Sequence, residues 1–283
     1  MASVVEKELL SLFESDPLRE KRVTAFYLPV LDWCKKQIRS DRTVLIGVNG
    51  PQGSGKTTLC ETMVIVSEVV GFRASTLSID DFYLNHKDQL ALARNSMENP
   101  YLQQRGYPGT HDVELGKRIL QALAGFKTGG RLQCPQYDKS AFSGRGDRFS
   151  ESHWKTIDGP LDLFFLEGWM LGYESNRSCS DPHLKVINSF LEIYASWNLL
   201  LESWIQLLPQ KINDVVQWRV DSEQKRRQQG QATFSDEEVT SYIKKFLPAY
   251  DAYLPAFTEK IRRHPSSLVI EIGSNRLPIS SRS

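Results

Sequence analysis

The fold of this 283-residue chain is decided by residues 50–57, which read Gly50-Pro51-Gln52-Gly53-Ser54-Gly55-Lys56-Thr57. They match the pattern Gly-x-x-x-x-Gly-Lys-Ser/Thr, in which a glycine-rich loop after a strand begins a helix and binds phosphate through backbone N–H groups. Glycines let the backbone approach phosphate oxygens without a Cβ in the way, and the helix N-terminus adds unpaired N–H groups and partial positive charge. The alternative is a glycine-rich turn that matches this pattern by chance, and the flanking sequence distinguishes it from a phosphate-binding loop.

The flanking sequence has the order that a phosphate-binding loop requires. Residues 43–48 are short, apolar and β-rich and end at Asn-Gly-Pro, whereas residues 57–70 have helical character. A second strand is expected at residues 74–79, directly after Gly71. Together they form a β-α-β unit, whose crossover is right-handed in a parallel sheet. This context favours nucleotide binding, to which we assign residues 50–57 together with Thr58.

The rest of the chain continues the alternation of strands and helices. Apolar runs predict buried strands at residues 161–166, 204–208 and 268–272. Helical stretches lie at residues 113–124, 183–201, 213–228 and 236–257. We therefore predict an α/β fold of the P-loop NTPase type: a doubly wound, mainly parallel sheet of five or more strands, with flanking helices and a helical lid.

Three segments outside this framework receive provisional roles within one domain of residues 1–283. Residues 1–40 have apolar positions at helical spacing, broken at Pro17 and Pro29, and predict an N-terminal helical extension. The polar residues 133–159 are a candidate acceptor loop, and the charged residues 219–235 are a candidate lid. We find no linker that would divide the chain.

Composition excludes several classes of protein. Lys and Arg number 35 against 34 Asp and Glu, so the chain lacks the overall basic charge expected of a nucleic-acid binder. No run reaches the roughly 18–20 apolar residues that span a bilayer, so no membrane partner is expected. The four cysteines are far apart, as in reduced cytosolic proteins, and the acidic start is unlike a targeting peptide. We expect a cytoplasmic protein, with the nucleus also possible, that is a monomer or homodimer.

A kinase-type site needs a metal ligand and a base beside the phosphate loop. Lys56 is expected to contact the β- and γ-phosphates and the Thr57 hydroxyl to bind Mg²⁺. Glu167 ends an apolar run and precedes glycine, so it is our second Mg²⁺ ligand; a surface ion pair is the alternative. Asp80 follows the second strand, at the sheet edge where α/β proteins bind ligands, and is our candidate base. A helix cap is the alternative there, a role that suits Asp81 better.

Several ordered motifs resemble one family. They are GPQGSGKTT, SIDDFY at 78–83, RGYPGTHD at 105–112, PQYDKSAFSGRGDR at 135–148 and LEGW at 166–169. This set is similar to the P-loop kinases that include phosphoribulokinase, uridine kinase and pantothenate kinase. Within that group the chain most resembles the D-glycerate 3-kinase family, including fungal members described only as probable ATP-dependent kinases. The resemblance covers nearly all of the chain after residue 40.

The resemblance implies roles for particular residues. The Asp before the aromatic pair of the D-x-F-Y motif is the base in these kinases, which is Asp80 here. Arg219 corresponds to a lid arginine over the leaving phosphate. Separately from the resemblance, residues 273–276, which include Asn275, follow the last predicted strand, and this place in the fold predicts part of the adenine pocket. The segments that line the acceptor pocket in these kinases map to Arg105, His111, Asp112, Tyr137, Lys139 and Arg148. Their cations suit an acidic acceptor, although Arg148 also fits a solvated loop pair with Arg145.

The leading hypothesis is a small-molecule kinase that uses ATP and Mg²⁺. Its partners would be ATP and a small hydroxylated, anionic acceptor, most plausibly D-glycerate or a similar hydroxy acid. Two alternatives stay open at this point: an ATP-binding regulatory protein, and a kinase for another acceptor such as pantothenate, a nucleoside or a sugar phosphate. The regulatory protein would keep Lys56 and Thr57 but would have no need of Asp80.

Overall fold

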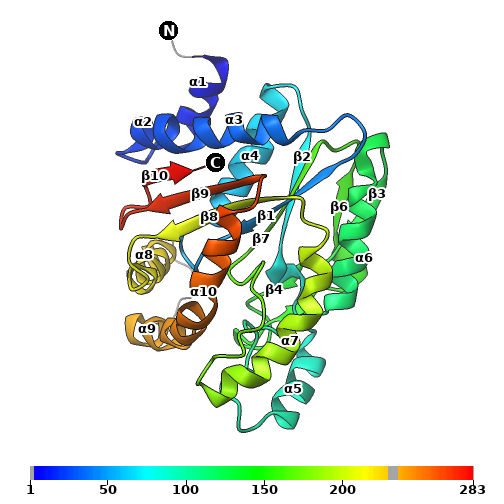
Figure 1. Cartoon of the computed structure of the whole chain (residues 1–283), viewed down its shortest axis with the longest axis vertical. Helices are drawn as coiled ribbons and strands as arrows, with labels where there is room; N and C mark the ends of the chain where they lie inside the picture. The colour runs from blue at the N-terminus through cyan, green and yellow to red at the C-terminus, as the bar shows by residue number, and fades with distance from the viewer. Residues whose placement is uncertain (1–2, 229–234, 283) are drawn as a thin grey trace.

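A six-stranded sheet runs through the middle of the computed structural model, which describes residues 3–228 and 235–282 (Figure 1). Its strand order is β10-β9-β8-β1-β7-β2. The strands are β1 (Val44–Asn49), β2 (Ala74–Ser78), β7 (Leu163–Gly168), β8 (Ser203–Pro209), β9 (Ser267–Ile272) and β10 (Pro278–Arg282). All neighbours pair in parallel except β9 and β10, which are antiparallel. The predicted doubly wound, mainly parallel sheet is confirmed, and all five predicted strands are present.

Helices cover both faces of the sheet. Figure 1 shows α3 (Leu28–Gln37) and α4 (Lys56–Val69) on one side, and α6 (Val113–Ala124), α7 (Pro182–Asn198) and α10 (Leu247–Arg262) on the other. The predicted N-terminal helices are α1 (Val4–Leu12), α2 (Arg19–Arg22), a π-helical turn at Val23–Tyr27, and α3. The predicted break at Pro29 is absent: residues 19–37 are helical throughout, and Pro29 lies in the first turn of α3, which directly follows the π-helical turn.

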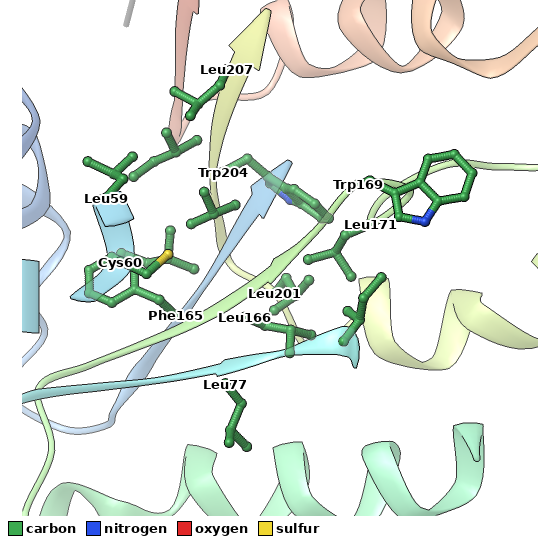
Figure 2. Close-up of a cluster of buried hydrophobic side chains, with 14 of the residues drawn as sticks. Leu59, Cys60, Leu77, Phe165, Leu166, Trp169, Leu171, Leu201, Trp204 and Leu207 are labelled. Carbon is green, nitrogen blue, oxygen red and sulfur yellow. The ribbon is translucent and has the colours of Figure 1, made fainter. Parts of the chain in front are cut away.

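The core follows the alternation of side chains along the strands. Figure 2 shows Phe165 of β7 pointing toward Leu59 and Cys60 of α4, whereas Leu166 points to the opposite side, near Leu201. All six residues of β1 are buried, because both faces of this central strand are covered. The phosphate loop therefore starts from a strand that is buried along its whole length.

Three further expectations about the elements were wrong or incomplete. The single helix predicted at residues 236–257 is two helices, α9 (Asp236–Lys244) and α10, because Pro248 in the first turn of α10 cannot donate a helical hydrogen bond. The sequence analysis also missed α5 (His86–Asn95) and β10. The exposed side chains of β10 carry no hydrophobic pattern, so only its backbone pairing with β9 defines it.

The predicted acceptor loop at residues 133–159 contains more regular structure than expected. Two short antiparallel pairs cross it, β3 (Arg131–Cys134) with β6 (Lys155–Asp158), and β4 (Tyr137–Asp138) with β5 (Asp147–Arg148). The predicted lid at residues 219–235 includes the second half of α8 (Asp214–Gln228), while its residues 229–234 lie outside the described residues. The division into extension, acceptor loop and lid stays a prediction.

Two further properties concern the chain as a whole. Within residues 3–228 and 235–282, no helix combines the length and apolar composition needed to cross a membrane. Cys34, Cys60, Cys134 and Cys179 are all free thiols, and the first three are buried.

Gly47 offers a test of the packing on the central strand. A Cβ at this position would lie 2.6 Å from Cζ3 of Trp204 and 3.1 Å from Cδ1 of Leu201. We expect Gly47→Ala to lower the free energy of unfolding by about 1–3 kcal/mol, because overpacking a filled core forces neighbouring side chains to shift. Urea unfolding measures this change.

Gly125 is the matched control, because it has a negative φ and a Cβ there would come no closer than 3.4 Å to the Ala122 carbonyl. Gly125→Ala should leave stability unchanged or raise it by about 0.4–1 kcal/mol. Equal losses in the two variants would show that the ring of Trp204 does not restrict position 47.

Candidate active site

The phosphate loop joins β1 to α4 and depends on glycine at two points. Gly53 and Gly55 have φ values of +76° and +97°, a region that L-residues with a Cβ rarely adopt. A Cβ on Gly53 would also lie 2.9 Å from Cβ of Trp218, because α8 packs directly on the loop. The fold thus brings the N-terminal half of α8 onto the turn that would hold phosphate.

Lys56 begins α4 and is only 8% exposed. Its Nζ donates to the carbonyl of Pro51 at 3.1 Å and lies 4.0 Å from Oε2 of Glu167. Burial lowers the pKa of Lys56, while the charges of Glu167 and Asp80 oppose that shift. A bound phosphate would bring further negative charge to this ammonium group, which is the role predicted for Lys56.

Glu167 and Thr57 form a pair of hard oxygen donors next to the loop. The Thr57 hydroxyl donates to Oε1 of Glu167 at 2.9 Å, and Glu167 is 5% exposed at the end of β7. Residues 3–228 and 235–282 contain no group of three or more His, Cys, Asp or Glu side chains arranged to hold a metal ion. Mg²⁺ at phosphate sites needs no such group, since one or two protein oxygens plus substrate phosphates and water suffice. The pair therefore fits Mg²⁺.

Asp80 and Asp81 follow β2, and the sheet register puts them near Glu167. Val48 of β1 and Ser78 of β2 both pair with Glu167, so the three strands end side by side. The residue that caps the 3₁₀ turn Ile79–Phe82 is Ser78, and Asp81 completes its capping box by accepting the Ser78 N–H at 3.1 Å. Asp81 is thus bound to the backbone, and the side chain of Asp80 is directed elsewhere.

The two carboxylates have opposite electrostatic environments. Oδ2 of Asp80 lies 2.5 Å from Nζ of Lys139. Burial disfavours the ionised form of Asp80, but the charge and hydrogen bond of Lys139 outweigh it and hold the pKa at about 2. Burial raises the pKa of Asp81 to about 6, and the neighbouring Asp80 charge adds to the rise. Asp80 is therefore ionised at neutral pH and paired with a cation from the predicted acceptor loop.

The predicted acceptor residues gather around Asp80. Residues 82–84 and 110–112 pair as antiparallel segments, which stacks the rings of Tyr83 and His111 with centroids 4.4 Å apart. The Tyr83 ring also meets Tyr137 edge-on at 5.2 Å. His111 and Tyr137 are both buried, and neither His111 Nε2 nor the Tyr137 hydroxyl has a hydrogen-bond partner within the described part of the chain.

Two of the predicted acceptor cations contact protein groups. Nη1 of Arg105 donates to the Gly144 and Arg145 carbonyls at 2.8 and 2.5 Å, and the guanidinium lies 5.5 Å from the centroid of the Tyr137 ring. Arg148 pairs with Asp112 at 3.1 Å, and Asp112 also caps α6. These contacts hold the acceptor loop against the 105–112 segment. Lys139, whose side chain is 60% exposed, is the predicted acceptor cation that contacts Asp80.

The predicted lid residue Arg219 lies in α8, where it forms an ion pair with the buried Glu223. The preceding residue, Trp218, packs on the phosphate loop, and its Nε1 donates to the Ser274 carbonyl at 2.6 Å. Asn275 is exposed, and its Oδ1 accepts the Leu277 N–H at 3.0 Å. Thr58 is an exposed residue in the first turn of α4. The geometry leaves the assignments of Arg219, Asn275 and Thr58 as predictions.

Sequence reasoning missed Arg276 as a support of the loop. Its Nε donates to the Gly53 carbonyl at 2.7 Å, its Nη2 donates to the Trp218 carbonyl at 3.0 Å, and its guanidinium lies 5.6 Å from the centroid of the Trp218 ring. One side chain thereby connects the phosphate loop, α8 and the turn before β10. The only sequence signal was its position in the Gly-Ser-Asn-Arg turn after β9.

Known proteins with a similar sequence are kinases. The chain is 36% identical to the chloroplastic D-glycerate 3-kinase of Arabidopsis thaliana, with 96% of this chain and 65% of that relative aligned, so it spans just under two thirds of the plant protein. It is 34% identical to the uncharacterized kinase mug58 of Schizosaccharomyces pombe, covering 95% of it, and 33% identical to the probable ATP-dependent kinase TDA10 of Saccharomyces cerevisiae, covering 88%. The alignments include 88% and 84% of this chain. The chain belongs to this kinase family.

A solved structure agrees with this assignment. The D-glycerate 3-kinase from Cryptococcus neoformans superposes with a TM-score of 0.77 at 27% identity, and the match covers 93% of this kinase and 98% of that chain. No family model matches the sequence. The resemblance seen in the sequence motifs is confirmed, and the protein is a kinase of this family.

The Arg276 contacts lead to a prediction about the kinase. We expect Arg276→Ala to lower the free energy of unfolding by about 1–3 kcal/mol, because two carbonyls lose a charged donor in a partly buried place. The KM for ATP should rise several-fold, since the Gly53 turn and α8 lose their connection. Denaturant unfolding and initial-rate kinetics measure the two effects.

The control is Arg131→Ala, which removes an exposed ion pair with Asp158 across the β3–β6 pair. It should change neither stability nor the KM for ATP. An unaltered KM in Arg276→Ala would show that Arg276 stabilises the fold without shaping the ATP site.

Proposed function

We propose that the kinase transfers the γ-phosphoryl group of ATP to a hydroxyl of D-glycerate or a similar hydroxy acid. The observation that carries the proposal is the pair of Asp80 and Lys139 at 2.5 Å, beside the phosphate loop. It puts a carboxylate able to accept a proton next to a largely exposed cation able to bind an acidic acceptor. The names of the plant and Cryptococcus relatives agree with a glycerate acceptor.

The nucleotide side of the site follows from the loop. We assign ATP phosphate binding to residues 50–58, with Lys56 on the β- and γ-phosphates. Thr57 and Glu167 would hold Mg²⁺, which supplies positive charge to the phosphate oxygens as they become more negative. Arg219 would add charge from α8 by exchanging its ion pair with Glu223 for a phosphate contact. Asn275 would lie beside the adenine.

The acceptor side centres on Asp80. The acceptor hydroxyl oxygen forms a bond to the γ-phosphorus while the bond from that phosphorus to the β,γ-bridging oxygen breaks, and the hydroxyl proton passes to Asp80. An acceptor carboxylate at Lys139 would partly neutralise the charge that holds the pKa of Asp80 at about 2, which makes Asp80 a better base. We propose that Lys139, His111 and Tyr137 contact the acceptor, while Arg105, Asp112 and Arg148 shape the loop around it.

The cysteines bear on the compartment. Because all four cysteines are free thiols, we propose a reducing compartment such as the cytoplasm.

A panel of acceptors tests the function. Purified protein with Mg-ATP should phosphorylate D-glycerate in preference to pantothenate, uridine, ribulose 5-phosphate and glycerol, which differs from glycerate in lacking the carboxylate. Lys139→Met should raise the KM for D-glycerate about tenfold or more, since it removes a charge-assisted contact. Its effect on any turnover of glycerol should be small.

Two outcomes would contradict the proposal. Turnover of uridine or pantothenate alone would assign a different acceptor to the same site. Tight ATP binding without turnover of any acceptor would instead favour a regulatory protein.

Asp80 and Asp81 are distinguished by matched substitutions. We expect Asp80→Asn to lower kcat by on the order of 10²–10⁴-fold, the range typical for loss of a general base. Asp81→Asn should keep most of the activity, because the amide oxygen can still accept the Ser78 N–H. Steady-state kinetics on both variants measure the difference, and equal losses would remove Asp80 as the base.

The pH dependence of kcat/KM gives the same pair a second readout. A base must be ionised, so activity falls as the pH drops through its pKa in the free enzyme. If Asp80, with a pKa of about 2, is the base, its protonation causes no loss of kcat/KM between pH 5 and 7. If Asp81, with a pKa of about 6, were the base, kcat/KM would fall as the pH drops through that range. Dividing the wild-type profile by that of Asp81→Asn cancels the ionisation of ATP, and the ratio should be flat.

A further inference from the structure

The imidazole of His111 has one nitrogen engaged and one without a partner. His111 is 4% exposed, and its Nδ1 lies 2.7 Å from the hydroxyl oxygen of Tyr194. Its Nε2 is buried, with no hydrogen-bond partner in residues 3–228 and 235–282. A buried polar nitrogen without a partner is destabilising and needs an explanation.

The contacts of Tyr194 favour one of the two neutral forms of His111. The Gly109 N–H donates to the Tyr194 oxygen at 3.1 Å and so occupies one of its acceptor positions, which favours an arrangement in which the hydroxyl hydrogen is donated to His111 Nδ1. Burial lowers the pKa of His111 to about 3 against the opposing charge of Asp80, so the imidazole is neutral at pH 7. A neutral imidazole has one N–H, and an Nδ1 that accepts leaves that hydrogen on Nε2.

Backbone pairing holds this imidazole next to the residues that follow β2. The Leu84 N–H donates to the Thr110 carbonyl at 2.9 Å, and the Asp112 N–H donates to the Phe82 carbonyl at 2.8 Å. His111 is thereby stacked on Tyr83, whose backbone N–H donates to the Asp80 carbonyl at 3.3 Å. The Nε2–H group of His111, which has no acceptor within the described residues, is thus one side chain, that of Tyr83, away from the proposed base Asp80.

Tyr194 is itself held by the packing of α7. Phe190, Tyr194 and Trp197 have the spacing of one helix face. A Cβ on Gly109 would lie 2.8 Å from Cγ of Phe190, and Nε1 of Trp197 donates to the Val113 carbonyl at 2.8 Å. This face of α7 therefore lies against the segment that contains His111.

We propose that Tyr194 is a positioning residue that keeps His111 in its Nε2–H form, so that this N–H donates to an oxygen of the acceptor. The acceptor must then present an oxygen lone pair, from its carboxylate or a hydroxyl, at this point. The inference rests on the proposed hydroxy-acid function, because it gives the buried donor a substrate oxygen as its partner.

Nuclear magnetic resonance of ¹⁵N-histidine-labelled protein tests which neutral form His111 adopts, and it requires no turnover. Two-bond ¹⁵N–¹H correlations distinguish the two neutral forms, and the chain has five histidines, so His111→Gln assigns the signal. We expect the Nε2–H form in the wild type at pH 7. In Tyr194→Phe we expect a shift toward the Nδ1–H form or a mixture. An Nδ1–H or doubly protonated His111 in the wild type would overturn the proposal.

Steady-state kinetics test whether the His111 N–H contacts the acceptor. Tyr194→Phe should raise the KM for D-glycerate about tenfold, the equivalent of one lost hydrogen bond, while the KM for ATP stays within about twofold. His111→Gln, which keeps an N–H donor at the end of a side chain of similar length, should be less impaired than His111→Ala.

The matched control is Tyr253→Phe. The Tyr253 hydroxyl, on α10, donates to Asn188 of α7 at 2.9 Å, so it contacts the helix that carries Tyr194 but not His111. Its loss should therefore leave both KM values unchanged. Equal changes in Tyr194→Phe and Tyr253→Phe would reduce Tyr194 to a structural role. An enzyme that does not phosphorylate D-glycerate would remove the proposed function, while the imidazole signal would still decide the tautomer.

Discussion

The turn between β1 and α4 is the constraint on which the rest of the site depends. It needs two glycines at positive φ, and Gly53 also needs space under Trp218. Arg276 hydrogen-bonds the Gly53 carbonyl, and Tyr250 hydrogen-bonds the side chain of Gln52, so distant parts of the chain hold the turn in shape. A loop that presents its N–H groups to phosphate gives up hydrogen bonds of its own, so the surrounding structure must support it.

Strand register converts this local turn into a site. Because β7 lies between β1 and β2, Glu167 ends beside the loop and Asp80 follows one strand further on. Adjacent Asp80 and Asp81 then acquire different chemistry from their surroundings: a lysine holds one ionised, while burial favours the proton on the other. Such separation of neighbouring pKa values is how one site can combine a base with a structural carboxyl group.

The sequence predicted the parts of the fold that depend on short-range pattern. Residues 163–168 form a buried strand that ends in a single carboxylate, and the helix at residues 113–124 was predicted with its bounds. Failures occurred where pattern is weak. β10 has exposed side chains and exists through pairing with β9, and the break between α9 and α10 comes near a proline inside an otherwise periodic stretch. The candidate site residues were found through motifs, whereas Arg276 and Tyr194 belong to no motif.

By itself, the amino-acid sequence determined the phosphate loop, the parallel sheet that follows from alternating strands and helices, and the kinase family. Those depend on glycine positions, on hydrophobic period and on the order of motifs, all of which can be read along the chain without knowing its three-dimensional contacts. Only the tertiary structure decided that Lys139 pairs with Asp80, that Arg105 supports the acceptor loop, and that the Tyr194 hydroxyl meets His111 across 83 residues of sequence. Such contacts join side chains from separate elements, and their existence depends on how the helices and loops pack around the sheet edge.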